Sequence, residues 1–297
     1  MKLLLHLFFI IAASSSYSQD LLIKTDGTTI PYKKLKWDES IVAVTTDKNE
    51  KITVREENVF GMYDEINQRV LYKKPNVPLN DNAQPKKEVS GFQYLQKEES
   101  GMINLYMKLY EGGKSSIYYF YAEKGNEFKN IMFTGAFGKN DDLIMFKSLF
   151  TDDRQIMDEI DTKGFVYSIR NMVKLIKRYN LAHFENPAAQ DYMSVGTIGF
   201  FTKAEGKVKA SIVLKVNDSL EYKMPASHHP LPIKVPLNKP SKVCANWEGG
   251  SACELVQPIS YATTYYEVEI NLNKTFELEK KTYSQFKSYI SKAMQSD

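Results

Sequence analysis

The segment from Cys244 to Cys253, CANWEGGSAC, holds both cysteines of the chain. Gly249 and Gly250 lie between them, and glycine adopts the positive φ angles that a tight chain reversal needs. The spacing is longer than that of a C-x-x-C redox motif or of the cysteine pairs in zinc modules. We therefore predict a β-hairpin closed by a Cys244–Cys253 disulfide, a bridge that stabilises a fold by about 2–3 kcal/mol.

Two alternatives for the cysteines remain open. One is a zinc site of two cysteines and two histidines, with His228 and His229 of the SHHP segment as partners. Neighbouring side chains in an extended segment point to opposite faces, which disfavours joint ligation by adjacent histidines. The other alternative is a pair of free thiols. Disulfides persist in the oxidising compartments that exported proteins enter, so the disulfide is favoured.

The N-terminus has the layout of a secretory signal peptide. Lys2 precedes an apolar run from Leu3 to Ala13, and Ser16 and Ser18 fit the positions before a cleavage site. This run is shorter than the roughly 20 apolar residues that a transmembrane helix needs. We therefore expect residues 1–18 to be removed on export. The mature chain would keep no transmembrane segment and would reside in the periplasm, at the cell surface or outside the cell.

The composition is that of a globular protein with nearly balanced charge. Hydrophobic residues make up 43% and charged residues 25%, and the formal net charge is +3. So small an excess of positive charge gives no electrostatic basis for nucleic-acid binding. The 19 tyrosines, many of them in alternating runs, favour a β-rich fold.

Short alternating runs separated by Asp, Gly and Asn turns predict a small antiparallel β module over residues 19–74. Pro31 interrupts one run, so that strand is expected at a sheet edge or a bulge. Residues 75–90 contain three prolines and no apolar period, and we interpret them as an interdomain linker.

Residues 91–190 are predicted to form an α+β domain in which strands precede helices. Four strand-like runs come first. The run SSIYYFYA, residues 115–122, is apolar on both faces, as expected for a central strand or for a strand with one face covered by helix. Two Asp pairs are placed to cap two helices. A third helix is predicted from an apolar stripe at helical spacing, made of Val166, Ile169, Val173, Ile176 and Tyr179.

Residues 191–297 are predicted to form a β-rich domain, a sandwich or barrel-like fold, that ends in a helix. The run YYEVEINL alternates in polarity, with Tyr266, Val268 and Ile270 on one face. The segment from Pro225 to Pro240 carries five prolines, so it is expected as an extended loop or an edge excursion. From Thr282 onward the apolar residues return to helical spacing, with a capping box at the start.

No motif for a catalytic nucleophile, a nucleotide phosphate or an EF-hand calcium occurs in the chain. Asp141-Asp142 and Asp152-Asp153 are the carboxylate pairs that a glycosidase mechanism could use, but capping of the helices that follow accounts for both. We therefore predict no catalytic residues, no cofactor and no bound metal, and an enzyme is the less favoured interpretation.

Two segments resemble exported envelope proteins of the Bacteroidota type. One is the strand-rich run from Asp20 to Tyr63, and the other is the strand–helix block from Leu105 to Asn180. The resemblance implies an exported protein in which a small β module is followed by strands and helices. It implies no catalytic residues.

We predict a non-enzymatic binding or assembly module of the cell envelope, whose partner is an envelope protein or glycan. The predicted contact surface is formed by His228, His229 and Trp247, because binding residues concentrate in loops carried on a rigid scaffold. For Trp247 an exposed aromatic surface and a core residue remain equal alternatives. The alternative functions are a hydrolase acting on envelope glycan or peptide and a metal-binding module that uses the two histidines.

Overall fold

The computed structural model describes twelve segments of the chain: residues 19–38, 40–66, 69–75, 92–112, 115–133, 140–202, 211–225, 229–237, 239–258, 263–270, 276–281 and 283–296. The signal peptide predicted for residues 1–18 lies outside these segments. So does almost all of the linker predicted for residues 75–90.

The N-terminal strands form two sheets that pack face to face. They are β1 (Asp20–Lys24), β2 (Thr29–Tyr32), β3 (Lys34–Asp38), β4 (Ile41–Thr45), β5 (Lys51–Arg55), β6 (Val59–Asp64) and β7 (Arg69–Pro75), with the 3-10 helix η1 (Glu56–Asn58) before β6. Strands β3, β4 and β5 form one sheet, whose Val42 and Val44 pack on Leu22 of the other. Pro31 lies in β2, which is an edge strand as predicted.

The larger sheet continues without a break into the central region. Its next strands are β8 (Phe92–Glu99), β9 (Ile103–Gly112), β10 (Ser115–Lys124) and β11 (Glu127–Phe133). The eight strands run in the order β11-β10-β9-β8-β7-β6-β1-β2. Because β7 pairs directly with β8, with Tyr72 opposite Leu95, the chain on both sides of the predicted linker belongs to one sheet. That residues 19–74 and 91–190 fold as separate domains stays a prediction.

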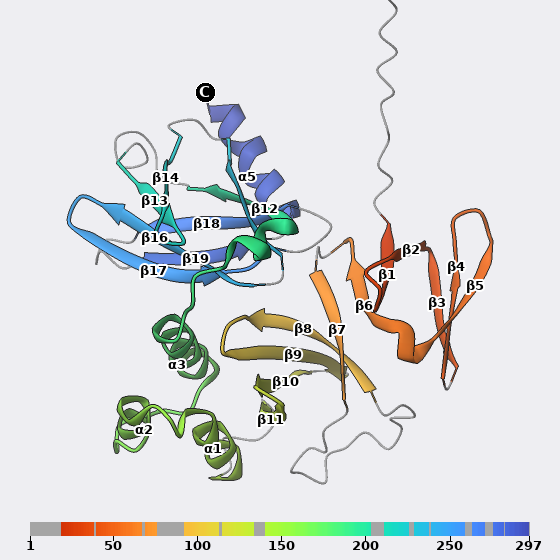
Figure 1. The fold of residues 1–297 in the computed structure, drawn as a ribbon, viewed down its shortest axis with the longest axis horizontal. Coiled ribbons are helices and arrows are strands. Elements are labelled where there is room, and N and C mark those ends of the chain that lie inside the picture. Colours follow the sequence, from red (N-terminus) through yellow and green to blue (C-terminus); the bar gives the residue numbers. More distant parts are fainter. Residues whose placement is uncertain are drawn as a thin grey trace, which may run out of the picture.

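Helices cover one face of the central strands, as Figure 1 shows. They are α1 (Asn140–Lys147), the 3-10 helix η2 (Ser148–Phe150), α2 (Arg154–Ile160) and α3 (Ile169–Ala182). Phe146 and Phe150 pack on Phe120 of β10, while Tyr119 and Tyr121 of the same strand are buried on the opposite face. Burial of β10 on both faces confirms the predicted order of strands followed by helices.

The apolar stripe predicted for the third helix is wrong at its N-terminal end. Ser168 caps α3 by accepting the backbone N–H of Asn171, so Val166 precedes the helix and is 64% exposed. The buried stripe begins later and consists of Met172, Leu175, Ile176 and Tyr179. The prediction extended the helix past its cap because Val166 and Ile169, on either side of Ser168, have the spacing of a helical stripe.

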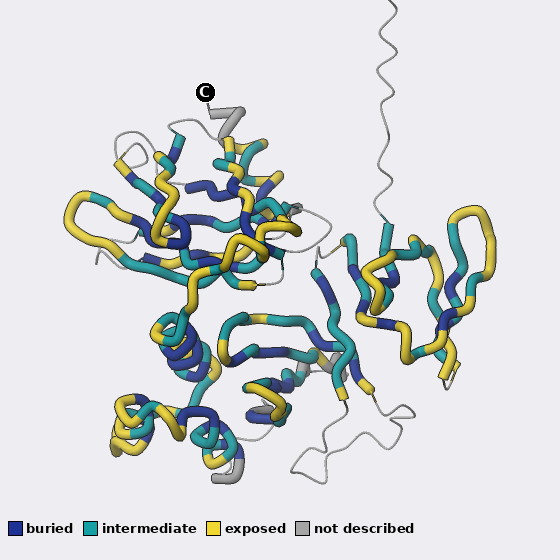
Figure 2. The backbone as a smooth tube through the Cα atoms, viewed as in Figure 1, coloured by how far each residue is buried: buried dark blue, intermediate teal, exposed yellow. Residues whose placement is uncertain are grey.

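The C-terminal region is a β-sandwich that follows the 3-10 helix η3 (Ala189–Met193). Its strands are β12 (Val195–Phe201), β13 (Val213–Val216), β14 (Leu220–Lys223), β15 (Leu231–Pro236), β16 (Ser241–Trp247), β17 (Gly250–Val256), β18 (Thr264–Ile270) and β19 (Phe276–Lys281). The two sheets, β15-β12-β18-β19 and β14-β13-β16-β17, share one apolar core. The buried stretches are dark in Figure 2. The proline-rich segment contributes β15, an edge strand, as its prolines require.

The C-terminal helix, α5 (Tyr283–Ser296), packs on the sheet that contains β18. Phe286 stacks on Tyr265 with 4.0 Å between ring centroids. Val268 faces the sandwich core as predicted, but Glu267 on the other face of β18 is buried too and pairs with Lys281 at 3.1 Å. Thr282, the start of the predicted capping box, lies outside the described residues. None of the helices in the described part of the chain has the length and apolar content that a bilayer crossing requires.

Candidate functional site

The predicted disulfide is present. Cys244 on β16 and Cys253 on β17 lie directly opposite each other in the ladder and are bonded, which is consistent with an oxidising compartment. The hairpin turns through two residues, Glu248 and Gly249, and Gly249 has a φ of 100°. Only one of the two glycines therefore takes the positive φ that a tight turn needs.

The structure describes two of the three residues of the predicted binding loop, Trp247 and His229. Trp247 is partly buried against the sandwich core, with its ring 6.2 Å from that of Phe276, so it packs as a core residue. It also covers Gly250, where a Cβ atom would lie 2.8 Å from the indole ring. His229 is exposed, and His228 lies outside the described residues. Within the described part of the chain, no three His, Cys, Asp or Glu side chains are grouped so as to hold a metal ion.

The carboxylate pairs named from the sequence have structural roles. Asp153 caps α2 by accepting the N–H of Ile156. Asp152 accepts from the Tyr179 hydroxyl and from Lys124, both at 2.7 Å, which ties β10 to α3. Asp142 is buried in α1. The Asp153 contact agrees with the capping interpretation for the second pair.

A charged cleft lies instead between the eight-stranded sheet and the C-terminal sandwich. Figure 1 shows the sandwich adjoining α3 and the β8–β9 hairpin. The cavity has a volume of about 510 Å³. Its charged lining residues are Arg69, Lys97, Glu98, Glu99, Lys177, Glu254, Glu279, Lys280 and Lys281, and the other residues include Tyr72, Ser100, Leu255 and Tyr266. Residues from both halves of the molecule thus form its walls.

A β-bulge directs the glutamates of β8 into this cleft. Lys97 is paired with Tyr106 of β9, but the next pair joins Glu99 to Leu105, so Glu98 is an extra residue in β8. Without the bulge, Glu99 would share the face of Lys97. With it, Glu99 lies on the face of Leu105, which is the face covered by α3.

A buried amide positions α3 against this hairpin. The Asn180 side chain donates to the carbonyl of Ile103 and accepts from its N–H, both at 2.8 Å. Gly101 allows this approach, because a Cβ atom there would lie 2.4 Å from Cγ of Asn180. The contact fixes the position of α3 along β9. Lys177 lies one turn earlier on the same helix, so the contact positions Lys177 as well.

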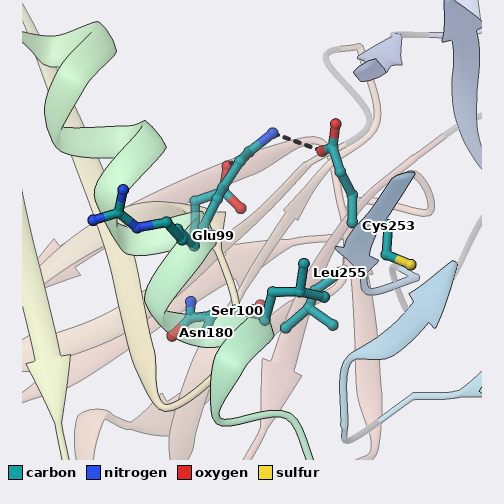
Figure 3. A pocket seen from close by; sticks show the side chains of 9 residues that line it. Glu99, Ser100, Asn180, Cys253 and Leu255 are labelled. Atoms are coloured by element: carbon teal, nitrogen blue, oxygen red, sulfur yellow. Dashed lines mark hydrogen bonds and ion pairs between the residues drawn. The ribbon is translucent and has the colours of Figure 1, made fainter. Parts of the chain in front are cut away.

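Lys177 links the two halves of the molecule across the cleft. Its ammonium is 2.9 Å from Glu254 on β17 and 3.7 Å from Glu99 on β8. The dashed line in Figure 3 marks the shorter of these contacts, with Glu99, Ser100 and Asn180 beside it. The other oxygen of Glu254 accepts the N–H of Leu278 at 3.0 Å, which satisfies a backbone donor of β19.

Burial changes the proton affinity of these groups. It raises the pKa of the Glu99 carboxyl from 4.5 to about 7, against the opposing effect of Lys177, and nearby Glu254 and Glu98 add to the rise. Burial disfavours the charged form of Lys177 as well, but the carboxylates of Glu99 and Glu254 outweigh it, and the pKa of Lys177 is raised. At neutral pH the cleft therefore holds a half-protonated Glu99 carboxyl next to the charged ammonium of Lys177.

The disulfide lies next to a residue of the cleft in the sequence. Cys253 immediately precedes Glu254 and lines a smaller cavity of about 170 Å³ that shares Glu99, Lys177 and Glu254 with the larger one. The bridge therefore secures the strand that presents Glu254. Glu254 is the one cleft residue that a sequence signal could have located, because it follows Cys253, whose disulfide was predicted. The sequence analysis identified the cysteines but not Glu254.

Sequence reasoning missed Glu98, Glu99, Lys177 and Lys280. A bulge and a contact between distant segments leave no local signal.

Comparison with protein-family models, with curated proteins and with solved structures gives no match. The class of the protein therefore rests on its own fold: a β-rich α+β chain with one disulfide and a charged cleft between its sheets.

Proposed function

We propose that this chain is an exported, non-enzymatic binding module of the cell envelope, and that the cleft between β8 and the sandwich holds its ligand. The observation that carries the proposal is the cavity of about 510 Å³, whose walls come from both halves of the molecule. Ligand sites are typically clefts of about 300–1,000 Å³ and are often found where domains meet.

The state of the carboxylates favours binding over catalysis. Glu254 is held by two donors, the Lys177 ammonium and the Leu278 N–H. A carboxylate held in this way presents fixed charge and is a poor general base. The Cys244–Cys253 disulfide supports the export part of the proposal, because such bridges persist outside the cytoplasm.

Calorimetric titration of the mature chain, residues 19–297, with soluble envelope glycan and peptide fragments tests the cleft. Ser100→Tyr puts a ring into the cavity and is expected to weaken binding at least tenfold. The matched control is Ser251→Tyr, at an exposed residue that lines neither cavity. Unchanged binding by Ser100→Tyr would place the ligand elsewhere.

The same titration separates the cleft from the predicted loop. Under the cleft proposal, His229→Ala and Trp247→Ala keep their affinity for the bound fragment, provided that each variant unfolds cooperatively. A loss of binding in His229→Ala alone would support the predicted loop as the contact surface in place of the cleft. The intact mass of the secreted chain, before and after thiol alkylation without reduction, checks cleavage after Ser18 and the absence of free thiols.

A hydrolase of envelope glycan or peptide is the second candidate, and one observation favours it. Glu99, with its pKa raised to about 7, lies across the Lys177 ammonium from Glu254, so Glu99 can act as the acid while the fixed charge of Glu254 stabilises a positively charged transition state. Release of reducing ends or free amines from envelope polymer measures it. A hydrolase loses this activity in Glu99→Gln, whereas a binding module releases neither product in any form.

A further inference from the structure

Most of the cations that line the cleft already have anionic partners. Arg69 pairs with Asp64 at 3.0 Å, Lys177 with Glu254 at 2.9 Å, and Lys281 with Glu267 at 3.1 Å. Their charge holds the walls together and is not available to a ligand. Two lysines of the lining differ from them, Lys97 on β8 and Lys280 on β19.

Lys97 has no carboxylate within ion-pair distance among the described residues. Its ammonium lies over the rings of Tyr72 and Tyr106, at 4.8 and 5.6 Å from their centroids. Glu123 is the nearest acid that affects it, and Lys74 is a second cation nearby.

Glu123 is already engaged by other donors. One of its oxygens is 2.5 Å from Lys74, and the other accepts from the Tyr106 hydroxyl at 2.7 Å and from Asn104 at 3.2 Å. Lys97 therefore contacts ring faces and the cleft, and Glu123 forms its ion pair with Lys74 instead.

Lys280 lies on the opposite wall of the cleft. Burial lowers the pKa of its ammonium and the carboxylates of Glu98 and Glu99 oppose the shift, yet neither forms an ion pair with it in the described part of the chain. Glu99 is drawn to Lys177 instead. The cleft thus presents two ammonium groups, one from each half of the molecule, that lack a carboxylate partner.

We propose that the cleft is an oxyanion site, in which Lys97 of β8 and Lys280 of β19 together bind one carboxylate or phosphate group of the ligand. This inference rests on the proposed function and names the chemistry that the cleft selects. An ammonium is a compact point charge that suits both kinds of oxyanion, so the two lysines set the sign of the ligand's charge and leave the rest of its structure to the cavity.

Because Lys97 and Glu99 bind protons near neutral pH, the affinity of the site for an anion should depend on pH. Burial, with the charge of Lys74, lowers the pKa of Lys97 to about 8, while Glu123 opposes the shift. Glu99, whose pKa is about 7, faces Lys177, Glu254 and Glu98. An anion binds best when Lys97 is charged and Glu99 is neutral. Affinity for a carboxylate ligand, which stays ionised over this range, is therefore expected to fall at least fivefold between pH 6 and pH 9.

The test is calorimetric titration of the mature chain with inorganic phosphate, with galacturonate and, as the neutral counterpart, with galactose. Wild type is expected to bind phosphate, galacturonate or both, and galactose at least tenfold more weakly. Comparison of the affinities for phosphate and galacturonate shows whether the site prefers a phosphate or a carboxylate group. Lys97→Met and Lys280→Met, which keep the aliphatic stem, are each expected to lose at least fivefold in affinity. Lys36→Met, at an exposed lysine of β3, changes nothing.

Lys97→Arg guards against a purely structural effect, because it keeps the charge over the rings of Tyr72 and Tyr106 and should retain most of the affinity. Equal binding of galacturonate and galactose, or unchanged anion affinity in both methionine variants, would overturn the inference. If a neutral envelope fragment still binds in a manner sensitive to Ser100→Tyr, the proposed function stands while the oxyanion site falls. If no fragment and no anion binds, both fall.

Discussion

The two hairpins that border the cleft are held in shape by different means. The β16–β17 hairpin is closed from within, by a two-residue turn and the Cys244–Cys253 bridge. The β8–β9 hairpin is held from outside, by the Asn180 amide on a helix 77 residues further along the chain. One wall of the cleft is therefore fixed by local and covalent structure, and the end of the other is fixed in addition by a contact from α3. The positions of Glu98 and Glu99 on β8 therefore depend on tertiary packing, whereas the position of Glu254 on β17 depends mainly on its own hairpin.

Removing the external support should have the largest effect. Asn180→Leu keeps the volume of the side chain but leaves the N–H and carbonyl of Ile103 buried without partners. We expect a loss of about 3–4 kcal/mol in the free energy of unfolding, measured by urea titration. The control is Asn186→Leu, at an exposed asparagine whose single bond to Asp218 is 3.4 Å long. Equal stabilities of the two variants would mean that α3 is held by its apolar face alone.

Removing the internal support should cost less. Replacing Cys244 and Cys253 together by serine is expected to lower the free energy of unfolding by about 2–3 kcal/mol. Native-state hydrogen exchange then sharpens the comparison, because faster exchange should be confined to β16 and β17, whereas Asn180→Leu should accelerate exchange in β8 and β9. If both variants loosen both hairpins, the cleft walls unfold as one unit and the proposed difference is wrong.

The same contrast explains what the sequence could predict. The disulfide hairpin, the central strands and the edge position of β15 follow from residues close to one another, and all were predicted correctly. The cleft was not predicted, because it needs an extra residue in β8, a buried amide from α3 and an acid from β17. Each is an ordinary polar residue until the chain folds. The error in the α3 stripe has a similar cause on a smaller scale. The hydrogen bond from the Asn171 N–H to Ser168 decides where the helix begins, and the apolar spacing does not reveal it.

A smaller change tests how closely α3 approaches the β8–β9 hairpin. In Gly101→Ala the new methyl group would lie 2.4 Å from Cγ of Asn180, so the amide must move away from Ile103. We expect a loss of about 2 kcal/mol in the free energy of unfolding. Gly164→Ala is the matched control, because no atom lies within 4 Å of its added Cβ. Combining Gly101→Ala with Asn180→Leu should cost less than the sum of the two changes, since both act on one contact.

The smallest expected effect concerns the charge that the bulge places in the cleft. The folded state raises the pKa of Glu99 from 4.5 to about 7, so ionising it costs stability. Below pH 4.5 the carboxyl is protonated whether the chain is folded or not, and the cost is absent. As the pH rises toward 7 the cost grows, and above 7 it is complete. Glu99→Gln should therefore gain about 1–2 kcal/mol relative to wild type between pH 4 and pH 8.

Lys177 keeps Glu254 as its partner in this variant, so no unpaired charge offsets the gain. Urea titrations at several pH values measure the difference, with Glu269→Gln, at an exposed residue of β18, as the control that should follow wild type. A Glu99→Gln curve parallel to wild type would mean that water reaches Glu99 as freely as an exposed carboxyl. The bulge would then turn the side chain without burying it. The contrast between a wall built by local covalent structure and one built by tertiary packing would no longer extend to the chemistry of the cleft.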